Sequence, residues 1–322
     1  MKLQRRMPRG WHRQIGRTGL FTSTIIAGAS PLGSMPQLYG YDVSESAAVD
    51  FVLSLLGSPI RAIDTSNNYG DGSSERRIGK AIELAGGLPD DFSVITKVDS
   101  ARGDFSGARV RESFRESVDR LGIHKVPLLL LHDPDPFDFR YMTSAGGAVD
   151  ALTQIRDEGL ADAIGVATGN TTLLHRYLDL GAFDVILSHN RFTLVDRSAD
   201  ELFTRAVELG VGVLNAAVYG GGILARPRES TTYAYKPASR GLRDTIAAME
   251  SVCTNHGIDL ATAALQFSLR DPRIDATVVG ITSERRISRL IASAGAHIPD
   301  SAWEELECLV PPASAWLDPL SR

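Results

Sequence analysis

Residues 60–84 read IRAIDTSNNYGDGSSERRIGKAIEL and contain one complete strand, loop and helix. The apolar run 60–63 predicts a buried strand, and the pattern of 75–84 predicts a helix. Asp64 ends the strand, and Tyr69 follows in a polar, glycine-rich loop. A carboxylate on a rigid strand end and a phenol on the next loop could form an acid/base pair. The same two residues could equally be structural, with Asp64 bonding loop amides and Tyr69 packing.

The same alternation of short apolar and longer amphipathic segments continues along the chain. The candidate strands are 25–28, 60–63, 92–96, 128–131, 163–167, 185–187, 211–214 and 276–279. The candidate helices are 46–56, 75–84, 108–121, 149–158, 172–180, 199–209, 242–256 and 284–292. Eight such units predict an α/β fold, a closed parallel (β/α)8 or TIM barrel. We expect an extra helix at 260–269, between the seventh of these helices and the last strand.

An open, doubly wound sheet is the alternative arrangement, because sequence does not reveal strand order. Residues 28–33 read GASPLG, so no Gly-x-Gly-x-x-Gly motif follows the first strand, and this disfavours the open sheet. The turn RTGL at 17–20 predicts a short hairpin that closes the bottom of the barrel.

The domain organisation is expected to be simple. We expect residues 1–14 to be a loose basic tail and 15–322 to form a single barrel domain. The long connections are 31–44, 134–145, 225–240 and the segment after residue 295.

The charge balance limits the partners. The chain has 34 Lys and Arg against 39 Asp and Glu, a net charge of −5, which argues against a nucleic-acid or anionic-membrane surface. Two cysteines form neither a disulfide framework nor a metal-ligand cluster, so we expect no metal. The longest apolar run, 126–131, is far shorter than the roughly 20 residues that span a bilayer, and the N-terminus lacks the apolar core of a signal peptide. We expect a cytoplasmic protein that acts on a small molecule; its oligomeric state is not readable.

Three ionisable residues lie at consecutive strand ends. Asp64 ends the second strand, Lys97 the third and His132 the fourth, with Tyr69 on the loop above. In a (β/α)8 barrel these ends meet at the face that carries active sites. Lys97 could simply pair with a carboxylate, and His132 could be a hydrogen-bonded core histidine. Packing alone explains the set poorly, because buried charges are costly unless they are paired.

The set suits proton transfer coupled to hydride transfer. A free tyrosine has a pKa of about 10, and we expect the ammonium of Lys97 to lower the pKa of Tyr69. Asp64 would hold Lys97, and His132 could orient a carbonyl or alcohol oxygen. No protein group stores a hydride, so a nicotinamide must accept or supply it.

At these positions the sequence resembles the aldo-keto reductase family, over roughly residues 15–292. The resemblance rests on 17–20, 63–79, 95–97, 130–135 (LLHDPD), 159–161 and 164–166. The family's catalytic Asp, Tyr, Lys and His match Asp64, Tyr69, Lys97 and His132. The resemblance implies a barrel with a nicotinamide cofactor across its mouth and Tyr69 as the general acid/base.

A narrower resemblance concerns a branch of the family that oxidises aldose sugars. Residues 191–194 (RFTL), 215–217 (NAA), Tyr219 and 222–224 (GIL) are similar to motifs of that branch. This implies oxidation of the hemiacetal carbon of an aldose, or of pyridoxal, to a lactone.

The resemblance also implies cofactor contacts. The family's usual Ser-Asn pair after the fifth strand is Ala167-Thr168 here, so Thr168 or Asn170 would hold the carboxamide. Where many members have a stacking aromatic this chain has Ala216, and the usual Gln of strand six is replaced near His189 and Asn190. The full expected set is Gly28, Asp64, Thr168, Asn170, His189, Asn190, Asn215, Ala216, Gly280, Ile281, Thr282, Ser283 and Arg286.

We expect NAD to be preferred over NADP. The adenosine end would lie at 280–283, a loop without the cation that a 2′-phosphate needs. Arg286 falls where the family often has a phosphate-binding Arg, so some use of NADP is also expected. Glu284 would oppose the phosphate if it faced the same side.

Three alternatives remain open. Lys97 could form a Schiff base, as in aldolases. The barrel could bind cofactor without catalysis, or it could be a general aldehyde and ketone reductase of the same family. Substrate specificity is expected from aromatics in the long connections and the C-terminal segment, namely Tyr39, Tyr41, Tyr233, Tyr235 and Trp316.

Overall fold

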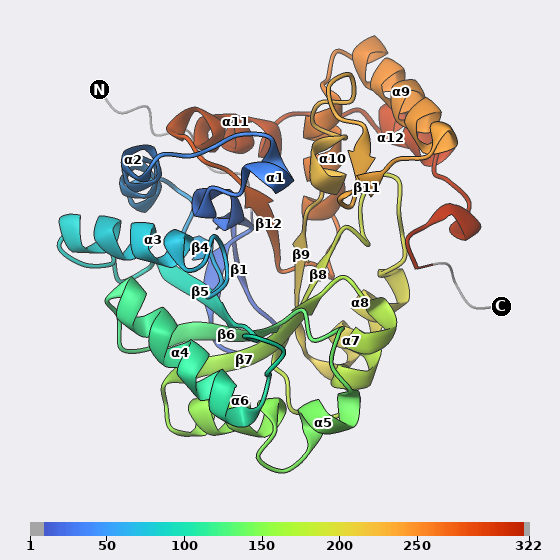
Figure 1. The fold of residues 1–322 in the computed structure, drawn as a ribbon. Helices are drawn as coiled ribbons and strands as arrows, with labels where there is room; N and C mark the ends of the chain where they lie inside the picture. Colours follow the sequence, from blue (N-terminus) through green and yellow to red (C-terminus); the bar gives the residue numbers. More distant parts are fainter. Residues whose placement is uncertain (1–9, 319–322) are drawn as a thin grey trace.

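Eight parallel strands close into a barrel at the centre of the protein (Figure 1). The computed structural model describes residues 10–318. The barrel strands are β3 (Ile25–Gly28), β4 (Ala62–Asp64), β5 (Ser93–Val98), β6 (Val126–His132), β7 (Ala161–Thr168), β8 (Val185–His189), β9 (Gly212–Ala216) and β12 (Ala276–Gly280). Each strand pairs in parallel with the next in sequence, and β12 joins β9 to β3. The predicted (β/α)8 barrel is confirmed, and the open sheet is excluded.

One helix after each strand covers the outside of the barrel. These helices are α2 (Glu45–Leu56), α3 (Ser73–Leu84), α4 (Gly107–Leu121), α6 (Ala148–Asp157), α7 (Thr171–Leu178), α8 (Asp200–Leu209), α10 (Leu260–Leu269) and α11 (Glu284–Ala294). Their apolar residues recur at helical spacing and pack on the strands, as Ala48, Phe51, Val52 and Leu55 of α2 do. The barrel interior holds a separate cluster of small and aliphatic side chains that alternate along the strands.

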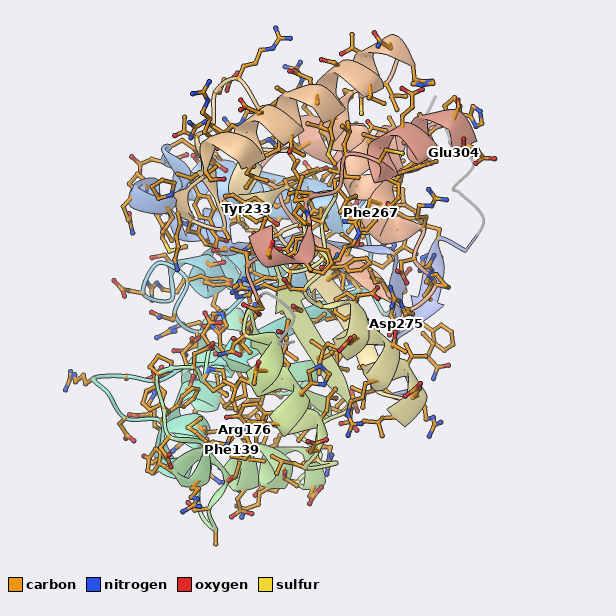
Figure 2. The ribbon with its side chains drawn as sticks, turned by 90° about the vertical axis from the view of Figure 1, so that its right-hand side faces the viewer. Phe139, Arg176, Tyr233, Phe267, Asp275 and Glu304 are labelled. Carbon is orange, nitrogen blue, oxygen red and sulfur yellow. The ribbon has the colours of Figure 1, made fainter. Side chains whose placement is uncertain are left out.

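A short antiparallel hairpin closes the bottom of the barrel, as predicted. Its strands are β1 (His12–Gln14) and β2 (Phe21–Ser23), and its Ile15 belongs to the interior cluster. Asp275, labelled in Figure 2, accepts hydrogen bonds from the backbone nitrogens of Gly16 and Val213 at 3.0 and 2.8 Å. The hairpin begins inside the segment 1–14 that was expected to be a tail, because Trp11 is buried and anchors it. Residues 1–9 lie outside the described residues.

The helices after β9 differ from the expectation. α10 buries six of its ten residues and packs against β12 and α11, so it is the seventh helix of the barrel ring. α9 (Arg240–Asn255) has three buried residues and packs on α10 and α12 (Asp300–Glu307) in an outer layer (Figure 1). The prediction that α10 is the extra helix was wrong. Its nearly continuous small and apolar sequence requires burial on several sides, whereas α9 has one narrow apolar stripe.

The long connections contain short elements that the sequence did not indicate. They are η1 (Ser30–Gly33), α1 (Pro36–Tyr39), α5 (Phe139–Thr143), η2 (Gly220–Gly222), the hairpin of β10 (Thr232–Tyr233) and β11 (Lys236–Pro237), and η3 (Ala313–Ala315). α5 is held on α7 by Arg176, whose guanidinium carbon lies 3.9 Å from the ring centre of Phe139 (Figure 2). Within residues 10–318, no helix has the length and apolar character to cross a membrane.

Two glycines of the hairpin turn allow a test of the bottom closure. Both have positive φ, +48° at Gly16 and +77° at Gly19, so alanine costs about 1 kcal/mol at either through left-handed backbone. A Cβ at Gly16 would also lie 2.4 Å from the nitrogen of Gly212, whereas a Cβ at Gly19 meets nothing within 4 Å. We expect Gly16→Ala to lower the free energy of unfolding by a further ~1–3 kcal/mol relative to Gly19→Ala in urea titrations. Equal losses would show that the hairpin does not pack tightly on β9.

Candidate active site

The last inward-facing residues of the eight strands together form one layer at the top of the barrel interior. Asp64, Lys97 and His132 each lie two residues beyond an inward-facing apolar residue of the same strand. Because strand side chains alternate between two faces, all three point inward at the C-terminal ends. The rest of this layer is small or polar, and it consists of Gly28, Ala167, His189, Ala216 and Gly280.

A buried ion pair lies at the centre of this layer. The ammonium of Lys97 is 2.6 Å from Oδ1 of Asp64 and donates to the carbonyl oxygen of Thr65 at 2.7 Å. It also lies 3.2 Å from the phenolic oxygen of Tyr69. Lys97 and Asp64 are 1% and 3% exposed, so little solvent screens the pair. The structure therefore brings together three of the four predicted catalytic residues in direct contact.

The surroundings of Tyr69 favour a neutral phenol. Burial raises the pKa of Tyr69 well above its usual value, and the negative charge of Asp64 raises it further. The lowering expected from Lys97 is outweighed, first by burial and then by Asp64. Asp64 lies closer to Lys97 than Tyr69 does and balances its charge, so the phenol experiences little net positive field.

His132, the fourth predicted residue, faces the same space. Its ring meets the Tyr69 ring edge to face, with centroids 5.5 Å apart. Its Nδ1 lies 2.7 Å from Oδ1 of Asp99, a buried residue just after β5 that the sequence analysis missed. The spacing could have identified Asp99, because it lies two residues beyond Lys97 and continues the same alternation.

The loop that carries Tyr69 is fixed by buried hydrogen bonds. The amide of Asn67 donates to Ser113 O, Glu116 Oε2 and Ser117 Oγ of α4, at 3.0, 3.0 and 3.3 Å. Arg120, also on α4, donates to the backbone oxygen of Asn67 at 2.9 Å. Sequence reasoning did not find these contacts, because α4 lies more than 40 residues away. The loop is thus held in place before any ligand binds.

A second carboxylate lies at the rim of the layer. Asp133 follows β6 with a positive φ of +41°, and its side chain is 56% exposed. Its two oxygens lie 3.7 Å from Nε2 of His132 and 3.6 Å from Nε2 of His189. Burial opposes ionisation, but the neighbouring His189 and His132, with the ammonium of Lys97, lower the pKa of Asp133 to about 2. Asp133 is therefore an ionised carboxylate at neutral pH.

A cavity of about 590 Å³ extends from these residues to α10 and α11. Of the expected cofactor contacts, those that line it are Gly28, Asp64, His189, Ala216, Gly280, Ile281 and Arg286. Arg289 and Ser293 of α11 line it as well. The cavity is therefore long enough to connect the catalytic layer with the first turns of α11.

Other expected contacts do not line this cavity. Thr168 and Asn215 lie on the outward-facing positions of β7 and β9; Thr168 donates to Asp135 at 2.5 Å, and Asn215 donates to Phe192 O at 3.0 Å. Asn170 caps α7 by accepting from Leu173 N. Strand alternation accounts for the placement of Thr168 and Asn215, since their neighbours Ala167 and Ala216 take the inward positions. The expected cofactor contacts of these three residues stay predictions.

The remaining three expected contacts also lie outside the lining. Asn190 is buried, with its amide nitrogen 3.1 Å from Nδ1 of His189. Thr282 and Ser283 precede α11, and their side chains are not part of the cavity wall.

The aromatic residues of the connections divide into two groups. Tyr39, Tyr41 and Tyr235 line the cavity. Tyr233, labelled in Figure 2, is buried and donates to Asn190 O at 2.9 Å, so it fastens the β10–β11 hairpin to the loop after β8. Trp316 donates to Pro311 O and is not part of the cavity wall.

A TIM barrel with a buried Asp and Lys and a half-buried Tyr and His at its C-terminal mouth defines an enzyme site. The chain belongs to the Aldo/keto reductase family, whose family model matches residues 24–310. It is therefore an NAD(P)-dependent oxidoreductase, and the family inferred from the motifs is confirmed.

Several relatives share most of their length with this chain. The D-threo-aldose 1-dehydrogenase of a Pseudomonas species is 30% identical, with 77% of this chain and 83% of the relative aligned. The L-galactose dehydrogenase of Arabidopsis thaliana is 32% identical, over 87% of both chains. The pyridoxal 4-dehydrogenase of Microbacterium luteolum is 28% identical, over 91% of this chain and 96% of the relative.

A solved structure shares the fold. A holo-form aldo-keto reductase from Bacillus halodurans superposes with a TM-score of 0.75 at 22% identity, covering 93% of this chain and 96% of that chain.

The buried ion pair predicts strong coupling between its two members. Lys97→Met leaves the Asp64 carboxylate buried without its counter-ion, which typically costs about 3–5 kcal/mol of unfolding free energy. Adding Asp64→Asn removes the stranded charge, so the double variant should be more stable than Lys97→Met alone. Urea unfolding of the two single variants and the double variant measures the coupling. Additive losses would show that the two charges do not stabilise each other.

Proposed function

We propose that this enzyme oxidises the hemiacetal carbon of an aldose sugar, or of pyridoxal, to a lactone with a nicotinamide cofactor. The observation that carries the proposal is the contact of Tyr69 with the Lys97–Asp64 pair at the floor of the cavity, with His132 beside it. The printed activities of the three relatives support the substrate class.

The proposed reaction removes a proton and a hydride from one C–OH group. Tyr69 first loses its own proton to solvent; the hydroxyl proton of the substrate then passes to the phenolate oxygen, while the hydride leaves the same carbon and its C–O bond becomes a carbonyl. When bound, oxidised nicotinamide supplies the hydride acceptor. Lys97 stabilises negative charge on the Tyr69 oxygen, and His132 positions the reacting oxygen.

The cavity residues fit a nicotinamide dinucleotide. Oδ2 of Asp64 is buried and has no hydrogen-bond partner within residues 10–318, so it is a free acceptor for a hydroxyl or amide of a ligand. Ala216 and Gly280 leave space along the wall, and α11 presents its N-terminal turn with Arg286 and Arg289. These features support an extended ligand between Tyr69 and α11.

The Asp133 rim supports a neutral, hydroxylated substrate. A carboxylate with a pKa of about 2 is charged at every physiological pH and accepts hydrogen bonds from sugar hydroxyls. The same charge opposes an anionic substrate, such as a sugar acid, in a partly desolvated cavity.

A second candidate is a general aldehyde and ketone reductase. The raised pKa of Tyr69 favours it, because a neutral phenol is ready to donate a proton to a carbonyl oxygen at neutral pH. Oxidation needs the phenolate. At pH values below the pKa of Tyr69, the rate of oxidation should therefore increase as the pH is raised.

A substrate screen tests the proposed function. Reduced-nicotinamide absorbance is followed with neutral aldoses, pyridoxal and a sugar acid as donors, and with simple aldehydes in the reverse direction. We expect turnover with an aldose or pyridoxal that increases with pH, and much weaker turnover with the sugar acid. Efficient reduction of open-chain aldehydes without oxidation of any sugar or pyridoxal would favour the reductase instead.

Removing the phenolic oxygen tests the role of Tyr69. Tyr69→Phe deletes the proton-transfer atom and should lower kcat by about 10²–10⁴-fold with the fold intact. Tyr177→Phe is a matched control, because the Tyr177 hydroxyl is buried in α7 without a hydrogen-bond partner in the described chain. Near wild-type turnover of Tyr69→Phe, under conditions where chemistry limits the rate, would contradict the role.

For the cofactor we propose a preference for NAD. The loop 280–283 has no cation, and Asp259 lies 3.7 Å from Arg289 and competes for it, which leaves Arg286 as the main partner of a 2′-phosphate. The ratio of kcat/KM for NAD to that for NADP should exceed one, and Arg286→Ala should raise this ratio further. A ratio below one would show that the α11 arginines suffice for NADP.

A further inference from the structure

Asp99 is a buried carboxylate beside the site that the proposed reaction does not use. Its Oδ1 lies 2.7 Å from Nδ1 of His132. Its Oδ2 accepts from the backbone nitrogen of Asn68 at 3.0 Å and from the hydroxyl of Ser66. One carboxylate therefore contacts both the histidine and the residue adjacent to Tyr69.

We propose that Asp99 is a positioning residue for the reaction: it keeps a hydrogen on Nδ1 of His132, directs Nε2 to the substrate oxygen, and fastens the loop that carries Tyr69. The inference rests on the proposed function only where it assigns the substrate oxygen to Nε2. The tautomer and the loop contact are properties of the free protein.

The hydrogen-bond partners determine the tautomer. A carboxylate only accepts, so the short contact with Asp99 requires a hydrogen on Nδ1 in both charge states of His132. The Ser66 oxygen also lies 3.0 Å from Nδ1, but its own hydrogen is donated to Asp99, so it too acts as an acceptor toward the ring. The cavity-facing Nε2 then accepts when His132 is neutral and donates when it is charged.

The surrounding charges favour the donating form. The groups that face His132 are the carboxylates of Asp99 and Asp133, the ammonium of Lys97 and the phenol of Tyr69. Burial lowers the pKa of His132 and Lys97 lowers it too, but the charge and hydrogen bond of Asp99, with Asp133, outweigh them and raise it. Donation from Nε2 is present below this raised pKa and is lost as pH rises through it.

The carboxylate of Asp99 also holds His132 and the loop of Tyr69 in a fixed relative position. Because Oδ2 holds the Asn68 nitrogen while Oδ1 holds the imidazole, the Tyr69 and His132 rings keep their edge-to-face arrangement without a ligand. Preorganisation of this kind lowers the cost of bringing an acid/base group to the reacting oxygen.

Asp99→Asn gives the sharpest test, because the direction of the new amide is determined in advance. The Asn68 backbone can only donate, so the amide oxygen must stay on that side and the amide NH2 must turn to Nδ1 of His132. The imidazole is then forced into the other neutral tautomer, with its hydrogen on Nε2.

The readout is imidazole ¹⁵N–¹H correlation spectroscopy of the protein without cofactor or substrate, assigned with His132→Gln. Above its titration midpoint, wild-type His132 should carry its hydrogen on Nδ1, and in Asp99→Asn on Nε2. The midpoint should fall by about one pH unit or more in the variant. Asp275→Asn is the matched control, since Asp275 also accepts two backbone nitrogens but lies at the barrel bottom; it should change neither signal.

Activity gives a second readout. In aldehyde reduction, the decline of kcat/KM that accompanies deprotonation of wild-type His132 should disappear in Asp99→Asn, because the neutral imidazole of the variant still carries a hydrogen on Nε2. The value of kcat/KM at neutral pH should be lower by about tenfold or more, because a neutral imidazole is a weaker donor than a charged one.

Three results would overturn the proposal: a wild-type hydrogen on Nε2 above the midpoint, a variant with unchanged tautomer and midpoint, or an unchanged pH profile. The wild-type spectrum decides the tautomer even if the variant does not fold. Failure to oxidise sugars, with the tautomer as expected, would contradict the proposed function and leave this inference standing.

Discussion

The buried pair of Lys97 and Asp64 is the interaction on which the site depends. Two charges removed from water are costly unless they neutralise each other at short range, and their 2.6 Å contact does so. The contact exists because β4 and β5 are adjacent in the barrel and direct their last inward side chains to the same layer. The strand order of the closed barrel thus determines which charged side chains meet at its mouth.

Burial, together with neutralisation of this pair, explains why the surroundings of Tyr69 favour the protonated phenol. An isolated ammonium 3.2 Å from a phenol would favour phenolate, but Asp64 cancels most of that effect. The phenol therefore stays protonated in the free protein. Lys97 contributes chiefly when negative charge develops on the Tyr69 oxygen during the reaction, which is where stabilisation accelerates a step.

The sequence predicted the barrel well because its strands and helices differ clearly in length and periodicity. Strand alternation also accounts for Asp64, Lys97 and His132, and applied more strictly it would have placed Thr168 and Asn215 at outward-facing positions. The roles of α9 and α10 were exchanged in the prediction, because the order of two helices in the sequence does not show which of them packs against the barrel. The contacts of Asn67 with α4 depend on three-dimensional proximity between distant segments, which local patterns do not encode.

The central claim is that burial and the neutral ion pair together leave Tyr69 protonated in the free enzyme. Ultraviolet difference titration of wild type against Tyr69→Phe, without cofactor, measures tyrosinate formation at this residue alone. The account predicts no contribution from Tyr69 up to at least about pH 10, the usual pKa of a free tyrosine. Tyrosinate that appears near neutral pH in the wild type, and is absent in Tyr69→Phe, would contradict it.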